Sequence, residues 1–190
     1  MEPNLGKILI YEIDSKIKEA RLREMAKRIN LEVVAVTKDE IHNKVGALAG
    51  LSGYELRDPD EEDLKLEAPS AEMVLFVGVD YQDIVDLLGT LREEDHSFPH
   101  KANLTPTTKD WSFRALVKHI EVENLIVRAY MRLARDCQAA EELNKELQDP
   151  EIIEAVEYAK ALQGMGEDLS LRHIEQAQEK LNQALTGKTF

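Results

Sequence analysis

The fold of this chain is decided by Met73-Val74-Leu75-Phe76-Val77-Gly78-Val79 and by the residues that follow it. This nearly continuous apolar run is typical of a parallel strand that is covered on both faces. Residues 81–94 then show helical spacing, with Asp80 as the expected N-cap. A shorter strand is expected at 102–105. Strand, helix and strand joined by short loops predict a parallel βαβ arrangement.

Working outward towards the N-terminus, a second such unit is expected. Residues 7–11 and 31–36 are short apolar, strand-like runs, and residues 17–29 between them carry apolar side chains at helical spacing. Residues 41–48 predict a short helix. Glycines at 46, 50 and 53 predict a packed turn with positive φ at one or more of them. The acidic run 58–63 predicts an exposed loop.

Working towards the C-terminus, the pattern becomes helical throughout. Residues 108–147 predict one helix of roughly 60 Å, which is longer than a small α/β body is wide. Residues 152–159 and 171–185 carry two further apolar stripes, separated by Gly164-Met165-Gly166, and predict an αα-hairpin. The expected fold is therefore α/β, with a small, mostly parallel four-stranded sheet in the order 2-1-3-4 flanked by helices (residues 1–112). An all-helical C-terminal appendage follows (residues 113–190).

Composition narrows the class of protein. The chain has 190 residues, 43% hydrophobic and 32% charged, with a formal net charge of −13. Such an acidic surface repels phosphate backbones, so we expect no nucleic-acid partner. No apolar run approaches the roughly 20 residues that span a bilayer, and the N-terminus lacks the pattern of a signal peptide. With Cys137 as the only cysteine, we expect a cytoplasmic protein without disulfides and without a membrane partner.

Polar residues that follow the predicted strands form a candidate cleft, because ligands of open α/β sheets bind at the carboxyl ends of the strands. The candidate residues are Glu12, Asp14, Thr37, Asp80, Thr105 and Thr107. An acidic pair after one strand and an aspartate after another are typical of a receiver-like phospho-acceptor. The other interpretation of Asp80 is a plain helix cap.

No metal or cofactor is expected from the remaining candidate residues. Pro99 separates His96 from His100, so no regular helix presents both histidines to zinc. His119 and Glu123 share one helix face but supply only two ligands, where a structural site normally has four. Two packing roles are expected instead. Cys137 lies among small residues of the long helix, and Trp111, the only tryptophan, is expected to anchor the junction at its start.

The apolar stripes of the appendage need partners, either one another or another molecule. The stripe residues that we expect to mediate interaction are Val122, Ile126, Leu133, Leu143, Leu147, Ile174 and Leu181. A protein partner or a second copy of the chain would cover them.

Several of these segments resemble one protein family. The residues that carry the resemblance are Lys101-Ala102-Asn103-Leu104-Thr105-Pro106-Thr107-Thr108, Trp111, Val74–Val79, Asp86–Arg92 and Gly46–Tyr54. Together they make residues 5–125 resemble the DUF3783 family, a bacterial family of unknown function. The resemblance implies a compact α/β fold and names neither a reaction nor a catalytic residue.

Two hypotheses from different classes follow. The first is a non-catalytic protein-interaction or regulatory module that uses its helical appendage, in line with the number of apolar stripes. The second is a small-molecule or metal-dependent enzyme that uses the candidate cleft, with Glu12, Asp14, Asp80 and Thr105 as its working residues.

Overall fold

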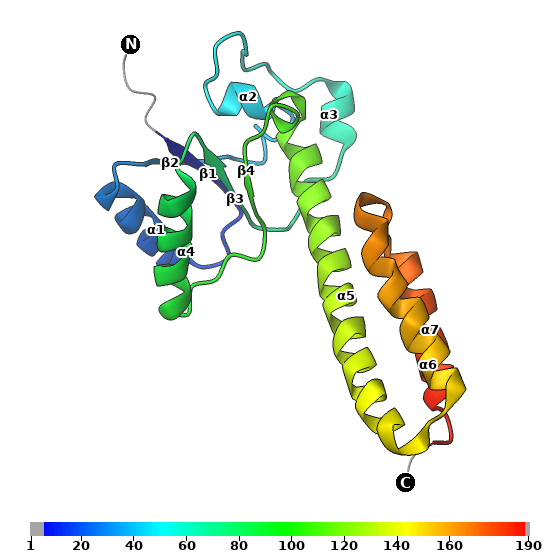
Figure 1. The fold of residues 1–190 in the computed structure, drawn as a ribbon. Helices are drawn as coiled ribbons and strands as arrows, with labels where there is room; N and C mark the ends of the chain where they lie inside the picture. The colour runs from blue at the N-terminus through cyan, green and yellow to red at the C-terminus, as the bar shows by residue number, and fades with distance from the viewer. Residues whose placement is uncertain (1–5, 189–190) are drawn as a thin grey trace. The chain divides into compact units, whose positions relative to one another are not determined.

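The computed structural model describes residues 6–188 and forms two compact units, Met1–Glu121 and Val122–Phe190 (Figure 1). Its elements in chain order are β1 (Lys7–Tyr11), α1 (Lys16–Arg28), β2 (Glu32–Ala35), α2 (Val45–Leu48), α3 (Glu61–Lys65), β3 (Met73–Val77), α4 (Tyr81–Glu93), β4 (Lys101–Asn103), the 3-10 turn η1 (Thr108–Asp110), α5 (Phe113–Leu147), α6 (Pro150–Ala161), the 3-10 segment η2 (Leu162–Asp168) and α7 (Leu171–Leu185). The units divide within α5, later than the predicted boundary at residue 112, because the first turns of this helix belong to the α/β core.

The first unit contains a four-stranded sheet in the order β2-β1-β3-β4, which confirms the predicted order. β1 pairs with β2 in parallel, and β3 pairs with β4 in parallel, each pair being joined through one helix. The central pair, β1 with β3, is antiparallel, and Tyr11 lies opposite Met73. The sheet is thus mostly parallel, as expected, but it consists of two parallel halves that run in opposite directions.

The direction of β3 follows from the path of residues 36–72. A parallel neighbour requires a crossover that carries the chain back to the opposite edge of the sheet. Residues 36–72, which form the short helices α2 and α3, instead bring the chain back to the end of the sheet where β1 and β2 finish, and β3 starts from that end. The segment is therefore a long connection between antiparallel strands and not a crossover connection.

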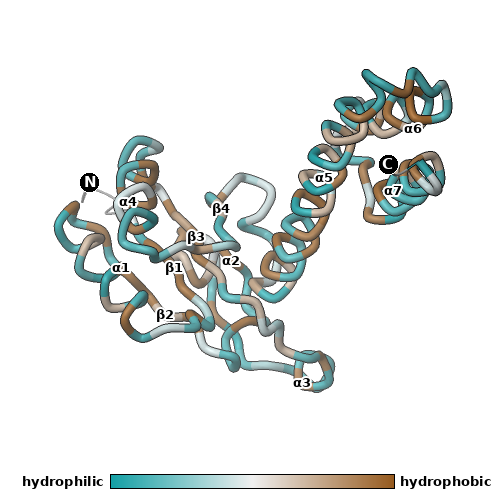
Figure 2. Tube along the Cα trace, turned by 90° about the horizontal axis from the view of Figure 1, so that it is seen from below, coloured by the Kyte–Doolittle hydropathy of each residue, from teal (hydrophilic) through white to brown (hydrophobic). Residues whose placement is uncertain are grey.

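The sheet is the middle of three layers. Helices α1 and α4 cover one face, where Ile8 and Phe76 meet Leu22 and Leu87. The other face packs against α2 and the first turns of α5, with Phe113 fully buried. In Figure 2 the central strands are largely brown between these helices, which reflects their hydrophobic sequence. Residues 73–77 of the apolar run are thus buried on both faces, as its composition predicts, whereas Gly78 is exposed.

The glycine-rich turn after α2 is packed as expected. Gly50 and Gly53 adopt positive φ angles of 73° and 85°. At Gly46 a Cβ atom would lie 2.7 Å from a ring carbon of Tyr54, so only glycine allows this approach. The acidic run that follows is not entirely a loop. Asp60 and Asp63 form a reciprocal capping box, and this pair starts α3.

The second unit contains the rest of α5 and the hairpin of α6 and α7, which confirms the predicted helical appendage. Asp149 caps α6 and Pro150 takes its first position, as the sequence indicates. Gly166 (φ 54°) breaks the chain between the two helices of the hairpin. Within residues 6–188, no helix is long and apolar enough to cross a membrane.

Candidate functional site

The candidate cleft is not assembled, because its residues lie at opposite ends of the sheet. β1 and β3 are antiparallel, so the end of β1 lies beside the start of β3. Glu12 and Asp14 follow β1 at that end, whereas Asp80 follows β3 at the other. Thr105 and Thr107 follow β4 and accompany Asp80, since β4 is parallel to β3. The prediction of one shared cleft was wrong, and with it the receiver-like arrangement of acids.

Each half of the predicted set has a local role. Glu12 pairs with Lys38 at 3.0 Å, and the side chain of Asp80 accepts a hydrogen bond from the backbone N–H of Gln82 at 2.8 Å. Asp80 is therefore a helix cap, the second of its two predicted interpretations. Thr107 makes no side-chain cap. Instead, Thr105 accepts a hydrogen bond from the backbone N–H of Thr108 at 3.1 Å, which closes the turn after β4.

A buried ion pair lies at the end of the sheet where β1 finishes. Lys18 Nζ donates to both carboxylate oxygens of Glu72, at 2.7 and 2.8 Å, and both residues are 7% exposed. Asp14 lies 3.3 Å from the same nitrogen, and the ring of Phe98 lies beneath it with its centroid at 4.5 Å. The pair connects α1 to the residue that precedes β3. Its two charges compensate each other inside the protein, and removing one partner would leave an uncompensated buried charge.

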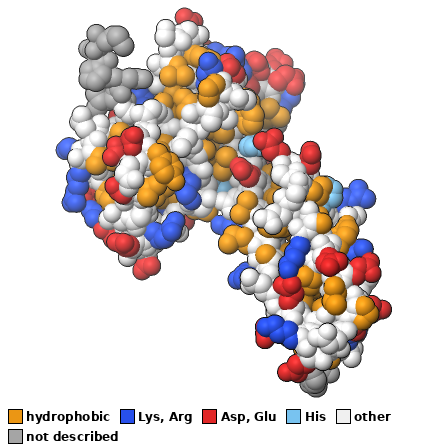
Figure 3. Space-filling model, in the orientation of Figure 1, with side chains coloured by type: hydrophobic (Ala, Val, Ile, Leu, Met, Phe, Trp, Pro, Cys, Tyr) orange, Lys and Arg blue, Asp and Glu red, His pale blue; other side chains and the backbone are white. Residues whose placement is uncertain are grey.

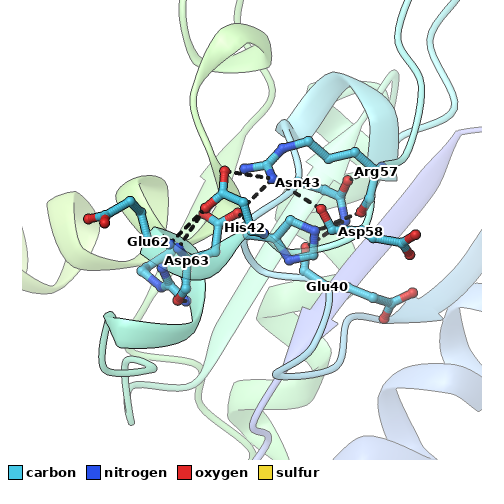
Figure 4. Close-up of polar contacts among 9 residues, drawn as sticks. Glu40, His42, Asn43, Arg57, Asp58, Glu62 and Asp63 are labelled. Atoms are coloured by element: carbon cyan, nitrogen blue, oxygen red, sulfur yellow. Dashed lines mark hydrogen bonds and ion pairs between the residues drawn. The ribbon is translucent and has the colours of Figure 1, made fainter.

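A second polar group, here called the loop cluster, consists of His42, Asn43, Arg57, Asp63 and Arg114. Figure 4 labels the first four of these residues. Asn43 is 3% exposed, and its Oδ1 accepts from the backbone N–H of Arg57 at 2.8 Å. His42 Nε2 lies 2.7 Å from the carbonyl oxygen of Arg57. Arg57 in turn pairs with Asp63 at 2.6 Å. These contacts bind residues 57–63 to the segment that follows β2.

The charged groups of the loop cluster stabilise one another's charged forms. The hydrogen bond from Arg57 is the main cause of the lowered pKa of Asp63, and this carboxylate is the main cause of the raised pKa of Arg57. Arg114, at the start of α5, donates to the carbonyl oxygen of Asp63 at 3.2 Å. In the described part of the chain, Arg114 Nε and His100 Nδ1 are the buried side-chain nitrogens without a partner. These contacts connect α3 to the segment after β2 and to the start of α5.

Replacing Asn43 with alanine is expected to destabilise the α/β unit by about 1–3 kcal/mol, because the N–H of Arg57 and the carbonyl oxygen of Glu40 lose their buried partner. Residues 54–66 should exchange their amide protons faster, while β1 and β3 keep their relative protection. Hydrogen exchange read by mass spectrometry measures both. Equal loss of protection throughout the unit would show that Asn43 has no local holding role.

The remaining candidate residues are packing residues or surface residues. Among residues 6–188, no group of three or more His, Cys, Asp or Glu side chains is placed to hold a metal ion. Cys137 is 4% exposed, lies in the helical core, and has a raised pKa mainly because of burial, which confirms its packing role. Trp111 packs against the α/β core and contacts His119 edge-on at 5.1 Å between ring centroids. Sequence analysis missed Lys18, Glu72, Asn43 and Arg57.

The apolar stripes of the second unit largely find their partners within the unit. Leu133, Ile174 and Leu181 are 1%, 3% and 0% exposed and form part of its core. They are therefore not available to a partner, contrary to the prediction. Ile126 and Leu147 are partly buried against this core. Leu143 lines a shallow groove between α5 and α7 together with Leu181. Of the predicted interaction residues, Val122 alone is more than half exposed, at 51%.

A different surface of α5 remains open, and we define it by seven exposed residues. They are Val122, Leu125, Val127, Arg128, Met131, Arg132 and Arg135, and we call this set the α5 surface. Residues three and four apart are neighbours on a helix, so the set is continuous. Its apolar members are about half exposed or more: Val122 51%, Leu125 50%, Val127 49% and Met131 61%. Figure 3 shows apolar side chains reaching the surface among charged ones, as such exposure requires.

The arginines of the α5 surface differ from those of α1. On α1, Arg21, Arg23 and Arg28 each pair with a glutamate, and the guanidinium of Arg21 bridges two. Among the described residues, no ion pair joins Arg128, Arg132 or Arg135 to a carboxylate, and the three occupy neighbouring positions. Like charges at such spacing repel one another by a few tenths of a kcal/mol. The row is a local concentration of positive charge in a chain whose formal net charge is −13.

Comparison with known proteins gives a family for part of this fold. Residues 72–126 match the model of the family described as Domain of unknown function (DUF3783). The match covers β3, α4, β4 and the first part of α5, and therefore confirms the resemblance over a shorter range than residues 5–125. It begins at Glu72 of the buried ion pair and includes Val122 and Leu125 of the α5 surface. Neither the search of curated proteins nor that of solved structures found a match.

Proposed function

We propose that this protein is a protein-interaction module that binds its partner through the α5 surface and has no catalytic role. One observation carries the proposal: exposed apolar side chains and unpaired arginines form a continuous stripe on one helix. Exposed apolar groups next to uncompensated charge are what a protein interface buries and pairs. A partner of the matching chemistry is an acidic protein segment with apolar side chains.

Two further observations support this function over an enzyme and agree with a cytoplasmic location. The residues offered for a catalytic cleft are divided between two ends of the sheet, and the buried ion pair and the loop cluster satisfy most of their own polar groups. The only cysteine, Cys137, is a buried thiol, so the chain folds without an internal disulfide. We place the protein in the cytoplasm, with a protein partner.

Photo-crosslinking tests the proposed function. A benzoylphenylalanine at position 127 of the full chain, in cells that naturally make the protein, should give a crosslinked product on irradiation. The same group at position 172, an exposed site on α7 outside the α5 surface, should not. Adding R128E and R132E to the position-127 chain should reduce the product about tenfold, because the arginines then repel an acidic partner.

Two outcomes would overturn the proposal. The first is the absence of a product at position 127 above the level at position 172. The second is a product that survives both arginine reversals, which would show that crosslinking reports collision and not binding. Circular dichroism of the reversed chain should match the parent, since these side chains are exposed.

A further inference from the structure

A segment of the first unit has the chemistry that the α5 surface needs. Residues 56–66, here called the acidic segment, contain five carboxylates and two basic residues. Three leucines of the segment are strongly exposed: Leu56 60%, Leu64 73% and Leu66 54%. Its composition complements that of the α5 surface, with carboxylates where the α5 surface has arginines, and with leucines as its exposed apolar side chains.

The acidic segment is also held in shape before any partner arrives. Asp60 and Asp63 form the capping box of α3, and Arg57 pairs with Asp63. Lys65 pairs with Glu62 at 2.7 Å. These contacts engage both basic residues of the segment, while Asp58 and Glu61 make no ion pair within the described residues. A segment ordered in advance loses less conformational entropy on binding than a disordered one.

We infer that the partner of the α5 surface is a second copy of this chain, which docks its acidic segment there. The inference rests on the proposed function and adds the identity of the partner. Leucines of the segment would cover the apolar side chains of α5, and Asp58 and Glu61 would meet the unpaired arginines. The apolar members of both surfaces are exposed, each within its own unit.

The proposed assembly is a closed, two-fold symmetric dimer. Each copy carries one α5 surface and one acidic segment, so a two-fold symmetric dimer that forms both contacts would leave neither surface unpaired. The same complementarity in an open arrangement would produce filaments. A net charge of −13 on each copy opposes association at long range, and the local attraction between the two surfaces has to exceed that repulsion.

A charge-swap experiment tests the inference by sedimentation velocity on the full chain. The parent should form a dimer of twice 21.6 kDa, and added salt should weaken it by screening the ion pairs. R128E/R132E should raise the dimer dissociation constant about tenfold or more, and so should D58K/E61K. An equimolar mixture of the two variants should form a heterodimer, because every reversed surface then meets its opposite. Asp60 and Asp63 are left unchanged so that α3 keeps its cap.

A matched control separates local pairing from net charge. R92E/R172E changes the net charge by the same amount as R128E/R132E, at exposed arginines outside both surfaces. This variant should dimerise like the parent after correction for overall repulsion. A parent that stays monomeric at every concentration overturns the inference, and so does a mixture that yields no heterodimer. If position 127 crosslinks to a different protein, the proposed function stands, and only the inference that the partner is a second copy of this chain is rejected. If nothing crosslinks there, both fall.

Discussion

Replacing Lys18 with methionine is expected to lower the free energy of unfolding by about 3–5 kcal/mol, because it leaves a buried charge without its partner. The change leaves Glu72 as a buried carboxylate that has lost both of its hydrogen bonds to Nζ. It also removes the cation above the Phe98 ring. Denaturant unfolding, followed by the fluorescence of Trp111 in the same unit, measures the loss.

Two further variants show whether the loss comes from the unpaired charge. Lys18→Met with Glu72→Leu replaces the ion pair with apolar groups and should recover most of the stability, because no charge then stays buried. Asp14→Asn removes only the exposed member, whose side chain is 73% exposed, and should cost no more than about 1 kcal/mol. If the single and double variants unfold alike, the buried carboxylate is not the source of the effect.

Local pattern predicted most of the elements of the first unit. Strand β1 at Lys7–Tyr11 and helix α4 at Tyr81–Glu93 coincide with their expected ranges to within a residue. The direction of β3 relative to β1 was not predictable in the same way. It depends on how residues 36–72 return the chain, and the turn signals in that segment mark bends without fixing where the bends lead.

Helix α1 shows why the buried ion pair escaped sequence analysis. The apolar spacing of residues 17–29 begins at Ile17, yet Ile17 is 73% exposed and its neighbour Lys18 is buried. Lys18 lies four residues before Leu22, on the same stripe, but a lysine is placed in a core only when its partner is known. That partner, Glu72, is 54 residues away in the chain. A long-range polar contact of this kind leaves no local signal.

The helical unit illustrates a related limit. Three apolar stripes were correctly predicted, but sequence analysis could not decide whether they cover one another or a second molecule. In the structure Leu133 on α5, Val156 on α6 and Leu181 on α7 meet in one core. The surface left open carries Arg128, Arg132 and Arg135. Their spacing is visible in the sequence, whereas their lack of ion-pair partners is visible only in the fold.

Replacing Leu181 with alanine is expected to destabilise the second unit by about 2–5 kcal/mol, because the side chain is fully buried between α5, α6 and α7 and leaves a cavity. Amide protons of α6 and α7 should exchange faster by a corresponding factor, while those of β1 and β3 keep their protection. Hydrogen exchange read by mass spectrometry resolves the two units, so the result does not depend on the whole chain unfolding in one step.

The dependence of this loss of stability on protein concentration shows whether the apolar stripe of α7 packs within one chain or against a second copy. A core formed within one chain gives the same destabilisation at every concentration, whereas a core shared between copies gives a loss that shrinks as the protein is diluted to monomer. Ile153→Ala is the matched control: Ile153 lies on α6 but is 47% exposed, so its truncation should cost less than about 1 kcal/mol. A destabilisation by Leu181→Ala that vanishes on dilution would mean that α7 packs on another molecule. The α5 surface would then no longer be the distinct place where partners bind.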